Sequence, residues 1–202
     1  MGRVSGRKDD GKYEAPGEPG ESMTAVSAEQ YKAALGRFAS GVTVLTVRDE
    51  LDDHGITVTA FASISLEPPL VLASVAQASY LHEVLLRQDR WTVSVLAAGQ
   101  RSIATRFSEI GRPSARLLLS DLPHRRGAHS GALIIEDGMA ALECRTEQRI
   151  RAGDHTLLVG RVLNVAYVAD HAAPLLHVTG AYTSVTAPPA ASRTSTGDPW
   201  TD

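Results

Sequence analysis

The chain has 202 residues, of which 43% are hydrophobic and 21% charged, and its formal net charge at pH 7 is −3. This composition is typical of a globular protein, and its balanced charge gives no electrostatic reason to expect nucleic-acid binding. The single cysteine excludes an intramolecular disulfide framework and fits a reducing compartment, while no apolar run approaches the about 18 residues that would indicate a membrane span.

The two ends of the chain differ in composition from the middle. Residues 1–24 and 187–202 are rich in Gly, Pro, Ser, Thr and charged residues. Such segments bury too little apolar surface to offset the entropy of ordering, and the N-terminus lacks the apolar stretch of a secretory signal. We therefore expect a disordered N-terminal arm or tag over 1–24, one domain over 25–186, a disordered tail over 187–202, and a cytoplasmic location.

The folded part is predicted to begin with a short amphipathic helix. Ser27 and Gln30 have the spacing of a capping box. Apolar residues then recur at helical spacing from Tyr31 to Phe38, and Ser40-Gly41 ends the helix. We expect Tyr31 and Phe38 to anchor this helix to the rest of the fold.

Short β-rich runs follow, separated by Gly, Pro and Asp clusters. The predicted strands are Val42–Val47, Ile56–Ile64, Leu70–Val75, Trp91–Leu96, Ala140–Gln148, Thr156–Val168 and Leu175–Thr183, and the predicted helices are Ser79–Gln88 and Gly99–Phe107. The first three strands lie too close together for the helical crossover that parallel strands need. The chain is therefore predicted to form a mainly antiparallel β-barrel with Trp91 in its core.

Residues 108–139 are rich in Arg and Gly and show little periodicity. They are predicted to form a long loop, which inside a compact domain is usually functional or mobile. No G-x-G-x-x-G follows a predicted strand, and neither a P-loop nor a G-x-S-x-G is present. The seven histidines are scattered, so no metal site is predicted. Cys144 is expected to be a buried small side chain rather than a redox thiol.

The segment Gly55–Leu72 carries the clearest functional pattern. Thr57, Thr59, Ser63 and Ser65 alternate with apolar residues, so one face of the predicted strand carries mainly hydroxyl groups. Two interpretations stay open at this point. The face is either exposed and made of good β-formers, or it holds a phosphate or a heterocycle through hydroxyls and backbone N–H groups.

Several segments together resemble the flavin reductase-like family over about residues 28–185. They are Arg37–Thr46, Ser65–Leu70, Val93–Leu96 with Gln100, Arg106-Phe107, Ala141–Cys144 and Gly153–Gly160. The resemblance implies a split antiparallel β-barrel with a few short helices, usually a homodimer. It also implies the reductase component of a two-component system, which oxidises NADH and reduces FAD, with FMN possible. The reduced flavin would diffuse to a separate flavin-dependent monooxygenase.

The resemblance also implies which residues bind the cofactors. Flavin contacts are expected at Gly55, Ile56, Thr57, Val58, Thr59, Ser74, Val75, Ala76, Ser79, Tyr80, Arg106 and Phe107, and NADH contacts at Thr59, Ala60, Ala152, Gly153, Asp154 and His155. Arg106 is matched to a phosphate contact, although it fits equally a solvated cation at a helix end. Gly153-Asp154 also fits a plain hairpin turn.

Hydride transfer between a nicotinamide and a flavin needs no protein acid, base or nucleophile, so no catalytic side chain is predicted, with His155 a candidate proton source. The chain departs from the family pattern at Ala60, where Ser is frequent, and at Ser94, where Asn is frequent. Two other functions stay open: an oxidase with tightly bound FMN on the same barrel, and a non-catalytic carrier of flavin or haem.

Overall fold

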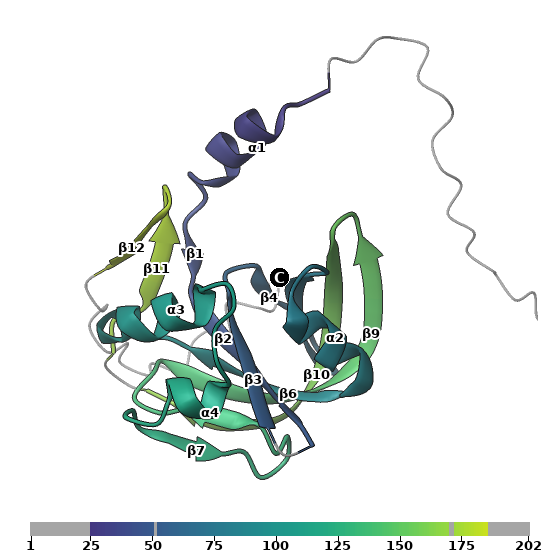
Figure 1. The fold of residues 1–202 in the computed structure, drawn as a ribbon, viewed down its shortest axis with the longest axis vertical. Coiled ribbons are helices and arrows are strands. Elements are labelled where there is room, and N and C mark those ends of the chain that lie inside the picture. The colour runs from purple at the N-terminus through teal and green to yellow at the C-terminus, as the bar shows by residue number, and fades with distance from the viewer. Residues whose placement is uncertain (1–24, 51, 170–171, 186–202) are drawn as a thin grey trace, which may run out of the picture.

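The computed structural model describes residues 25–50, 52–169 and 172–185, so the arm and the tail expected at 1–24 and 187–202 lie outside the described residues. A seven-stranded antiparallel sheet with the order β3-β2-β6-β9-β10-β5-β4 forms the body of the molecule (Figure 1). Its strands are β2 (Thr43–Asp49), β3 (Asp52–Val58), β4 (Phe61–Leu66), β5 (Pro69–Ala76), β6 (Arg90–Val95), β9 (Ala140–Ala152) and β10 (His155–Val168). The prediction of a mainly antiparallel β fold is confirmed.

The two edge strands of this sheet, β3 and β4, follow each other in the chain. We predicted a single strand over Ile56–Ile64, and this prediction was wrong because the strand breaks at Thr59 and Ala60. The break carries the chain from one edge of the sheet to the other, and the Ser74 N–H donates to the Ala60 carbonyl at 3.0 Å. The barrel is therefore split between β3 and β4, at a place without a Gly or Pro to mark it.

The barrel interior is closed at one end by α2 (Tyr80–Arg87), which begins at its N-cap Ser79. This helix buries Leu81, Val84 and Leu85 against the same cluster that contains Trp91. Trp91 is fully buried, and its indole N–H donates to the Thr146 hydroxyl at 2.9 Å. The expected core position of Trp91 is confirmed.

A second apolar cluster lies on the other side of β2 and β6, beneath short elements. These are η1 (Ala98–Gln100), α3 (Arg101–Ser108), α4 (Ala115–Leu118), β7 (His124–Arg126) and β8 (Leu133–Ile135). Predicting residues 108–139 as one long loop was therefore wrong. The segment contains a helix of four residues and strands of three, which are too short for a periodic pattern to appear.

A buried carboxylate fixes the loop between β7 and β8. Glu143 on β9 is 1% exposed and accepts bonds from the backbone N–H groups of His129 and Ser130, at 2.8 and 2.7 Å, and from the Asn164 amide at 3.0 Å. Burial alone would raise the pKa of Glu143, but bonds from Ser130, Asn164 and His129 outweigh it, and the pKa lies below its ordinary value. The Gly127–Gly131 segment is thus a cradle for a structural carboxylate.

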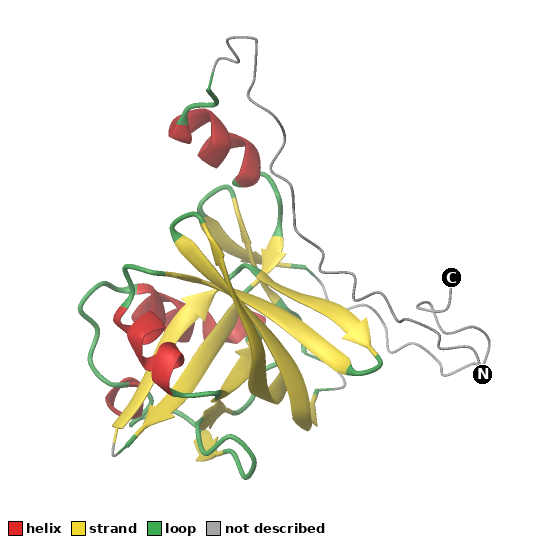
Figure 2. Cartoon of the chain, turned by 90° about the vertical axis from the view of Figure 1, so that its right-hand side faces the viewer, coloured by secondary structure: helices red, strands yellow, loops and turns green. Residues whose placement is uncertain are grey.

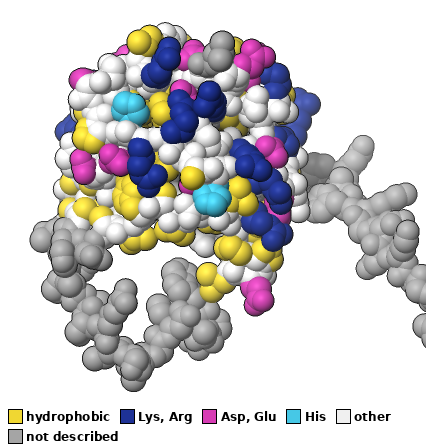
Figure 3. Space-filling model, turned by 90° about the horizontal axis from the view of Figure 1, so that it is seen from below, with side chains coloured by type: hydrophobic (Ala, Val, Ile, Leu, Met, Phe, Trp, Pro, Cys, Tyr) yellow, Lys and Arg dark blue, Asp and Glu magenta, His cyan; other side chains and the backbone are white. Residues whose placement is uncertain are grey.

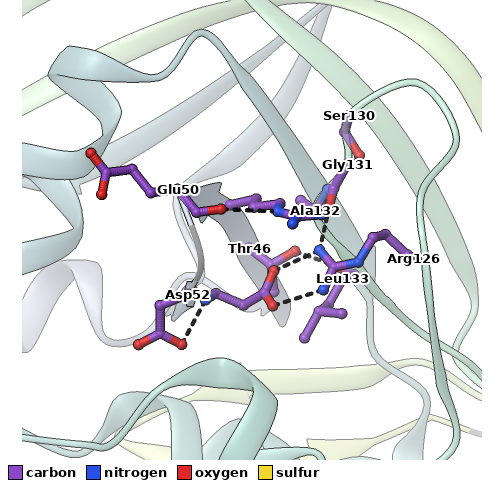
Figure 4. Close-up of polar contacts among 10 residues, drawn as sticks. Thr46, Glu50, Asp52, Arg126, Ser130, Gly131, Ala132 and Leu133 are labelled. Carbon is purple, nitrogen blue, oxygen red and sulfur yellow. Dashed lines mark hydrogen bonds and ion pairs between the residues drawn. The ribbon is translucent and has the colours of Figure 1, made fainter.

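An ion pair holds the same region to the edge of the sheet. Arg126 makes two hydrogen bonds of 2.9 Å with the buried carboxylate of Asp53 on β3. Close by, the Thr46 hydroxyl on β2 donates to the Leu133 carbonyl (Figure 4). These contacts tie the β7–β8 hairpin to β2 and β3.

The predicted strand Leu175–Thr183 is a hairpin of β11 (Leu175–Val178) and β12 (Ala181–Ser184), so that prediction was also wrong. Thr179 and Gly180 form the turn with φ of 50° and 75°. With β1 (Ser40–Gly41), this hairpin makes a separate three-stranded sheet in the order β1-β11-β12.

Helix α1 (Ala28–Leu35) stands away from the barrel (Figures 1 and 2). The predicted capping box between Ser27 and Gln30 is confirmed, with both bonds at 3.1 Å. The expectation that Tyr31 and Phe38 anchor the helix was wrong for the single chain, since they are 60% and 73% exposed. Helical periodicity identifies an apolar face but does not say which surface covers it.

Candidate functional site

A cavity of about 730 Å³ opens where β3, the end of β5, the start of α2 and the connection from α3 to α4 meet. Its walls are formed by His54, Gly55, Ile56, Ala76, Ala78, Ser79, Tyr80, Leu81, Ser108, Ile110, Gly111, Arg112 and Pro113. This volume lies within the range of about 300–1,000 Å³ that is usual for small-molecule sites.

The structure brings five of the predicted flavin residues to this cavity: Gly55, Ile56, Ala76, Ser79 and Tyr80. Ser79 also caps α2, since its hydroxyl accepts from the Leu81 N–H at 3.3 Å. Tyr80 meets His54 edge to face, with 5.1 Å between the ring centroids. His54 was missed by the sequence analysis, although it directly precedes Gly55.

The other predicted flavin residues do not line the cavity. Val58 and Val75 are buried in the barrel interior, and the Thr57 hydroxyl donates to the Ala104 carbonyl at 2.7 Å, which ties β3 to α3. Thr59 and Ser74 lie at and beside the break between the edge strands. For these residues, flavin contact stays a prediction.

Phe107 lies behind the cavity wall rather than in it. Its ring is fully buried and packs so closely on Gly55 that a Cβ at that position would lie 2.5 Å from the ring. Gly55 is therefore required by the close approach of α3 to β3. This packing sets the position of the strand that lines the cavity.

Arg106, the predicted phosphate ligand, is not among the residues that line the cavity. Its guanidinium forms two bonds to the Asp121 carboxylate, at 2.8 and 3.2 Å, and a third to the Leu118 carbonyl. Its role as a phosphate ligand stays a prediction, because a phosphate would have to compete with Asp121 for the guanidinium.

The arginine that lines the cavity is Arg112, which the sequence analysis missed. Its Nε donates to the Gly55 carbonyl at 2.6 Å and its Nη1 to the Glu109 carbonyl at 3.0 Å. Burial lowers the pKa of this guanidinium from its ordinary value. No local pattern could have found it, because the segment shows no periodicity and the contact with Gly55 spans 57 residues.

The predicted NADH residues 152–155 form the tip of the β9–β10 hairpin. The Gln77 side chain donates to the carbonyls of Gly153, at 3.2 Å, and His155, at 2.9 Å, and so binds the tip to the chain between β5 and α2. His155 lies opposite Ala76, which lines the cavity. A 2.8 Å bond from His155 lowers the pKa of Asp154. The tip therefore lies beside the cavity, whereas Thr59 and Ala60 lie at the strand break.

A second hollow of about 350 Å³ lies on the side of α2 that faces the hairpin. It is lined by Gln77, His82, Leu86, Arg149, Arg151 and Thr156. Arg149 donates to the Leu85 and Gln88 carbonyls, and His82 lies 2.9 Å from the Thr156 hydroxyl. Most of its polar groups thus already serve to hold the hairpin to α2.

Cys144 is fully buried, so the expectation of a buried side chain is confirmed, and burial raises the pKa of its thiol to about 12. Among the described residues, no group of three or more His, Cys, Asp and Glu side chains is placed to hold a metal ion. The helices in the same ranges are also too short or too polar to cross a membrane.

The family of this chain follows from its sequence and its fold together. The family described as "Flavin reductase like domain" matches residues 35–186. The chain belongs to the flavin reductase-like family. The resemblance found in the sequence is thereby confirmed, and so is the split-barrel fold.

Relatives of this flavin reductase-like chain include an NADH-dependent FMN reductase of Streptomyces nodosus subsp. asukaensis, which is 35% identical over 79% of the chain and 85% of the relative. The reductase component of a 4-hydroxyphenylacetate 3-monooxygenase from Thermus thermophilus is 38% identical over 76% of the chain and 94% of the relative. A solved NADH:FAD oxidoreductase of Streptomyces globisporus, in complex with NAD and FAD fragments, is 32% identical with a TM-score of 0.71, covering 77% of this chain and 90% of the other.

The flavin reductase component of a bacterial two-component tryptophan halogenase has a similar fold, with 32% identity and a TM-score of 0.74 over 79% of this chain and 99% of the other.

The cavity of the present chain fits a flavin nucleotide. Ile56 and Pro113 offer apolar surface to a planar ring, while Ser79, Tyr80 and Arg112 offer donors to its polar tail.

Proposed function

We propose that this chain is an NADH-dependent flavin reductase that reduces diffusible FAD, or FMN, and supplies the reduced flavin to a separate monooxygenase. The observation that carries the proposal is the large cavity between β3 and α2 in a chain of the flavin reductase-like family. NADH gives up a hydride and becomes NAD⁺, and the flavin takes up the hydride and a proton.

The protein contributes binding and orientation to this reaction. We expect the polar tail of the flavin to lie against Ser79 and Tyr80, with its ring toward Gly55–Thr59 and the strand break. The hairpin tip is expected to bind NADH from the side of Ala76, where Gln77 holds it in place. Because the two rings react only in close, aligned contact, a rigid cavity beside a fixed hairpin fits the chemistry.

We also propose that the active unit is a homodimer. In the single chain, the apolar side chains of Val26, Tyr31, Leu35 and Phe38 are at least half exposed. Apolar surface gathered on one projecting element usually marks an interface between proteins. A second copy of this chain is the occupant that the family resemblance favours.

Steady-state kinetics with the full chain would test the proposed reaction. NADH or NADPH consumption would be followed at their shared absorbance band with added FAD or FMN, in all four pairings. We expect turnover that depends on added flavin and is fastest with NADH. No oxidation with either flavin would overturn the proposal, and activity in yellow protein that ignores added flavin would indicate tightly bound FMN.

A further inference from the structure

Arg112 forms no ion pair with an acid in the described part of the chain. Ion pairs there join Arg87 to Asp49, Arg106 to Asp121, Arg125 to Glu136, Arg126 to Asp53 and Arg161 to Glu147, and Arg112 is in none of them. On the face drawn in Figure 3, Lys and Arg side chains spread over much of the surface, with Asp and Glu side chains scattered among them. Arg112 instead contacts two neutral backbone carbonyls.

The guanidinium is also placed to meet a ligand. It is half-buried in the wall of the 730 Å³ cavity, and it is the only Lys or Arg among the lining residues. Its bonds to Gly55 and Glu109 fix the plane of the group but use only part of its N–H donors. Removal from bulk water strengthens its attraction for any anion that enters the cavity.

We propose that Arg112 binds the phosphate of the flavin nucleotide and so makes the enzyme select FMN and FAD over riboflavin. This inference rests on the proposed function. FMN ends in a phosphomonoester and FAD contains a pyrophosphate, whereas riboflavin shares their ring and ribityl chain but has no anionic group. Planar guanidinium groups are well suited to phosphate oxygens because they can donate two parallel hydrogen bonds.

The position of Ser79 and Tyr80 also favours binding of the flavin phosphate beside Arg112. These residues line the cavity together with Arg112, and their hydroxyl groups are further donors for phosphate oxygens. Arg106 is already neutralised by Asp121 and lies outside the lining residues. The structure therefore favours Arg112 over Arg106 as the cation that meets the phosphate.

The test compares three flavins with the full-length protein in the absence of NADH. Dissociation constants for riboflavin, FMN and FAD would be measured by flavin fluorescence for the wild type and Arg112→Ala. We expect the variant to bind FMN and FAD about 10- to 100-fold more weakly, as for a lost hydrogen bond to a charged group. Riboflavin binding should change by less than about twofold, as for a neutral substitution.

Three further variants separate charge from fold. Arg112→Gln keeps a donor for the Gly55 carbonyl but no charge, and should lose the preference for phosphorylated flavins. Arg112→Lys should recover part of it. Arg116→Ala, on the exposed face of nearby α4 and outside the cavity lining, is the matched control and should bind all three flavins as the wild type does. Circular dichroism would confirm that each variant is folded.

An equal loss for riboflavin, FMN and FAD in Arg112→Ala would overturn the inference, because the side chain would then only latch the loop to Gly55. Unchanged FMN and FAD binding would overturn it too, as would a loss of phosphate preference in Arg106→Ala instead. A wild-type protein that binds no flavin would be a failure of the proposed function itself. The two failures are therefore distinguishable.

Discussion

Gly55 shows how a single residue positions the cavity wall. Phe107 packs against its backbone from one side, and Arg112 holds its carbonyl from another. The hydrogen atom of glycine lets α3 and the following loop approach β3 at this point. The cavity wall and the packing of the second apolar cluster therefore depend on the same small residue.

We expect Gly55→Ala to lower the free energy of unfolding by about 1–3 kcal/mol, because the new methyl group would clash with the Phe107 ring. Urea denaturation monitored by circular dichroism would measure this. Gly99→Ala is the matched control, since no heavy atom lies within 4 Å of its added Cβ. Equal midpoints for the two variants would contradict the packing that we describe.

Glu143 gives a prediction about pH. The Glu143 carboxylate accepts hydrogen bonds from the N–H groups of Ser130 and His129, and Glu143→Gln replaces it with a neutral amide that has fewer acceptor sites. We therefore expect the free energy of unfolding to fall by about 1–3 kcal/mol at pH 7. The folded-state pKa lies below the ordinary 4.5, so the stabilisation is present above that value and is lost as pH falls through the lower folded pKa. Chemical denaturation across this acidic range would measure it.

The variant should therefore show a flatter decline in stability below pH 4.5 than the wild type. Glu147→Gln is the control, because Glu147 lies on the same strand and pairs with Arg161 at the surface. Such pairs contribute about 0–1 kcal/mol. Parallel declines in Glu143→Gln and the wild type would show that the carboxylate does not stabilise the folded state in this way.

At the scale of elements, the strands of the β9–β10 hairpin belong to the barrel, and its tip carries the proposed NADH site. We expect His155→Ala to raise the KM for NADH by about 2- to 10-fold, as for a lost neutral hydrogen bond, and to change the KM for flavin less. Steady-state kinetics with each substrate varied would measure both. His129→Ala is the control, because the His129 side chain is exposed on the β7–β8 loop. A larger change in the KM for flavin would assign His155 to the flavin side.

The elements also show where sequence reasoning succeeds. The long β-rich run of β10 and the amphipathic helix α2 carry their own local signals, and both were predicted close to their observed positions. The break at Thr59 and Ala60 depends on which strands lie at the sheet edges, and no local residue marks it. Arg112 reaches the cavity only because α3 packs on β3, so its role depends on a contact between distant segments.

At the scale of the molecule, eight of the fourteen large apolar side chains that are exposed among the described residues lie on or beside α1, β4 and β10. Helix α1 and the residues around it expose Val26, Tyr31, Leu35 and Phe38. Strands β4 and β10 expose four more apolar side chains, namely Ile64, Leu66, Val165 and Val168. A projecting helix without buried residues of its own is marginal in water, so we expect the partner surface of the proposed dimer to supply most of its stability.

We expect light scattering coupled to size exclusion to give twice the chain mass of 21.5 kDa. Phe38→Asp should weaken the dimer by about 2 kcal/mol or more, as for a central aromatic residue of an interface. Sedimentation velocity over a range of concentrations would measure the dissociation constant. Leu117→Asp is the control. Leu117 is 61% exposed on α4, which packs on the second apolar cluster rather than belonging to the α1 surface, so this substitution should leave the dimer intact. A monomeric wild type, or equal effects of the two substitutions, would contradict a dimer that is built on α1.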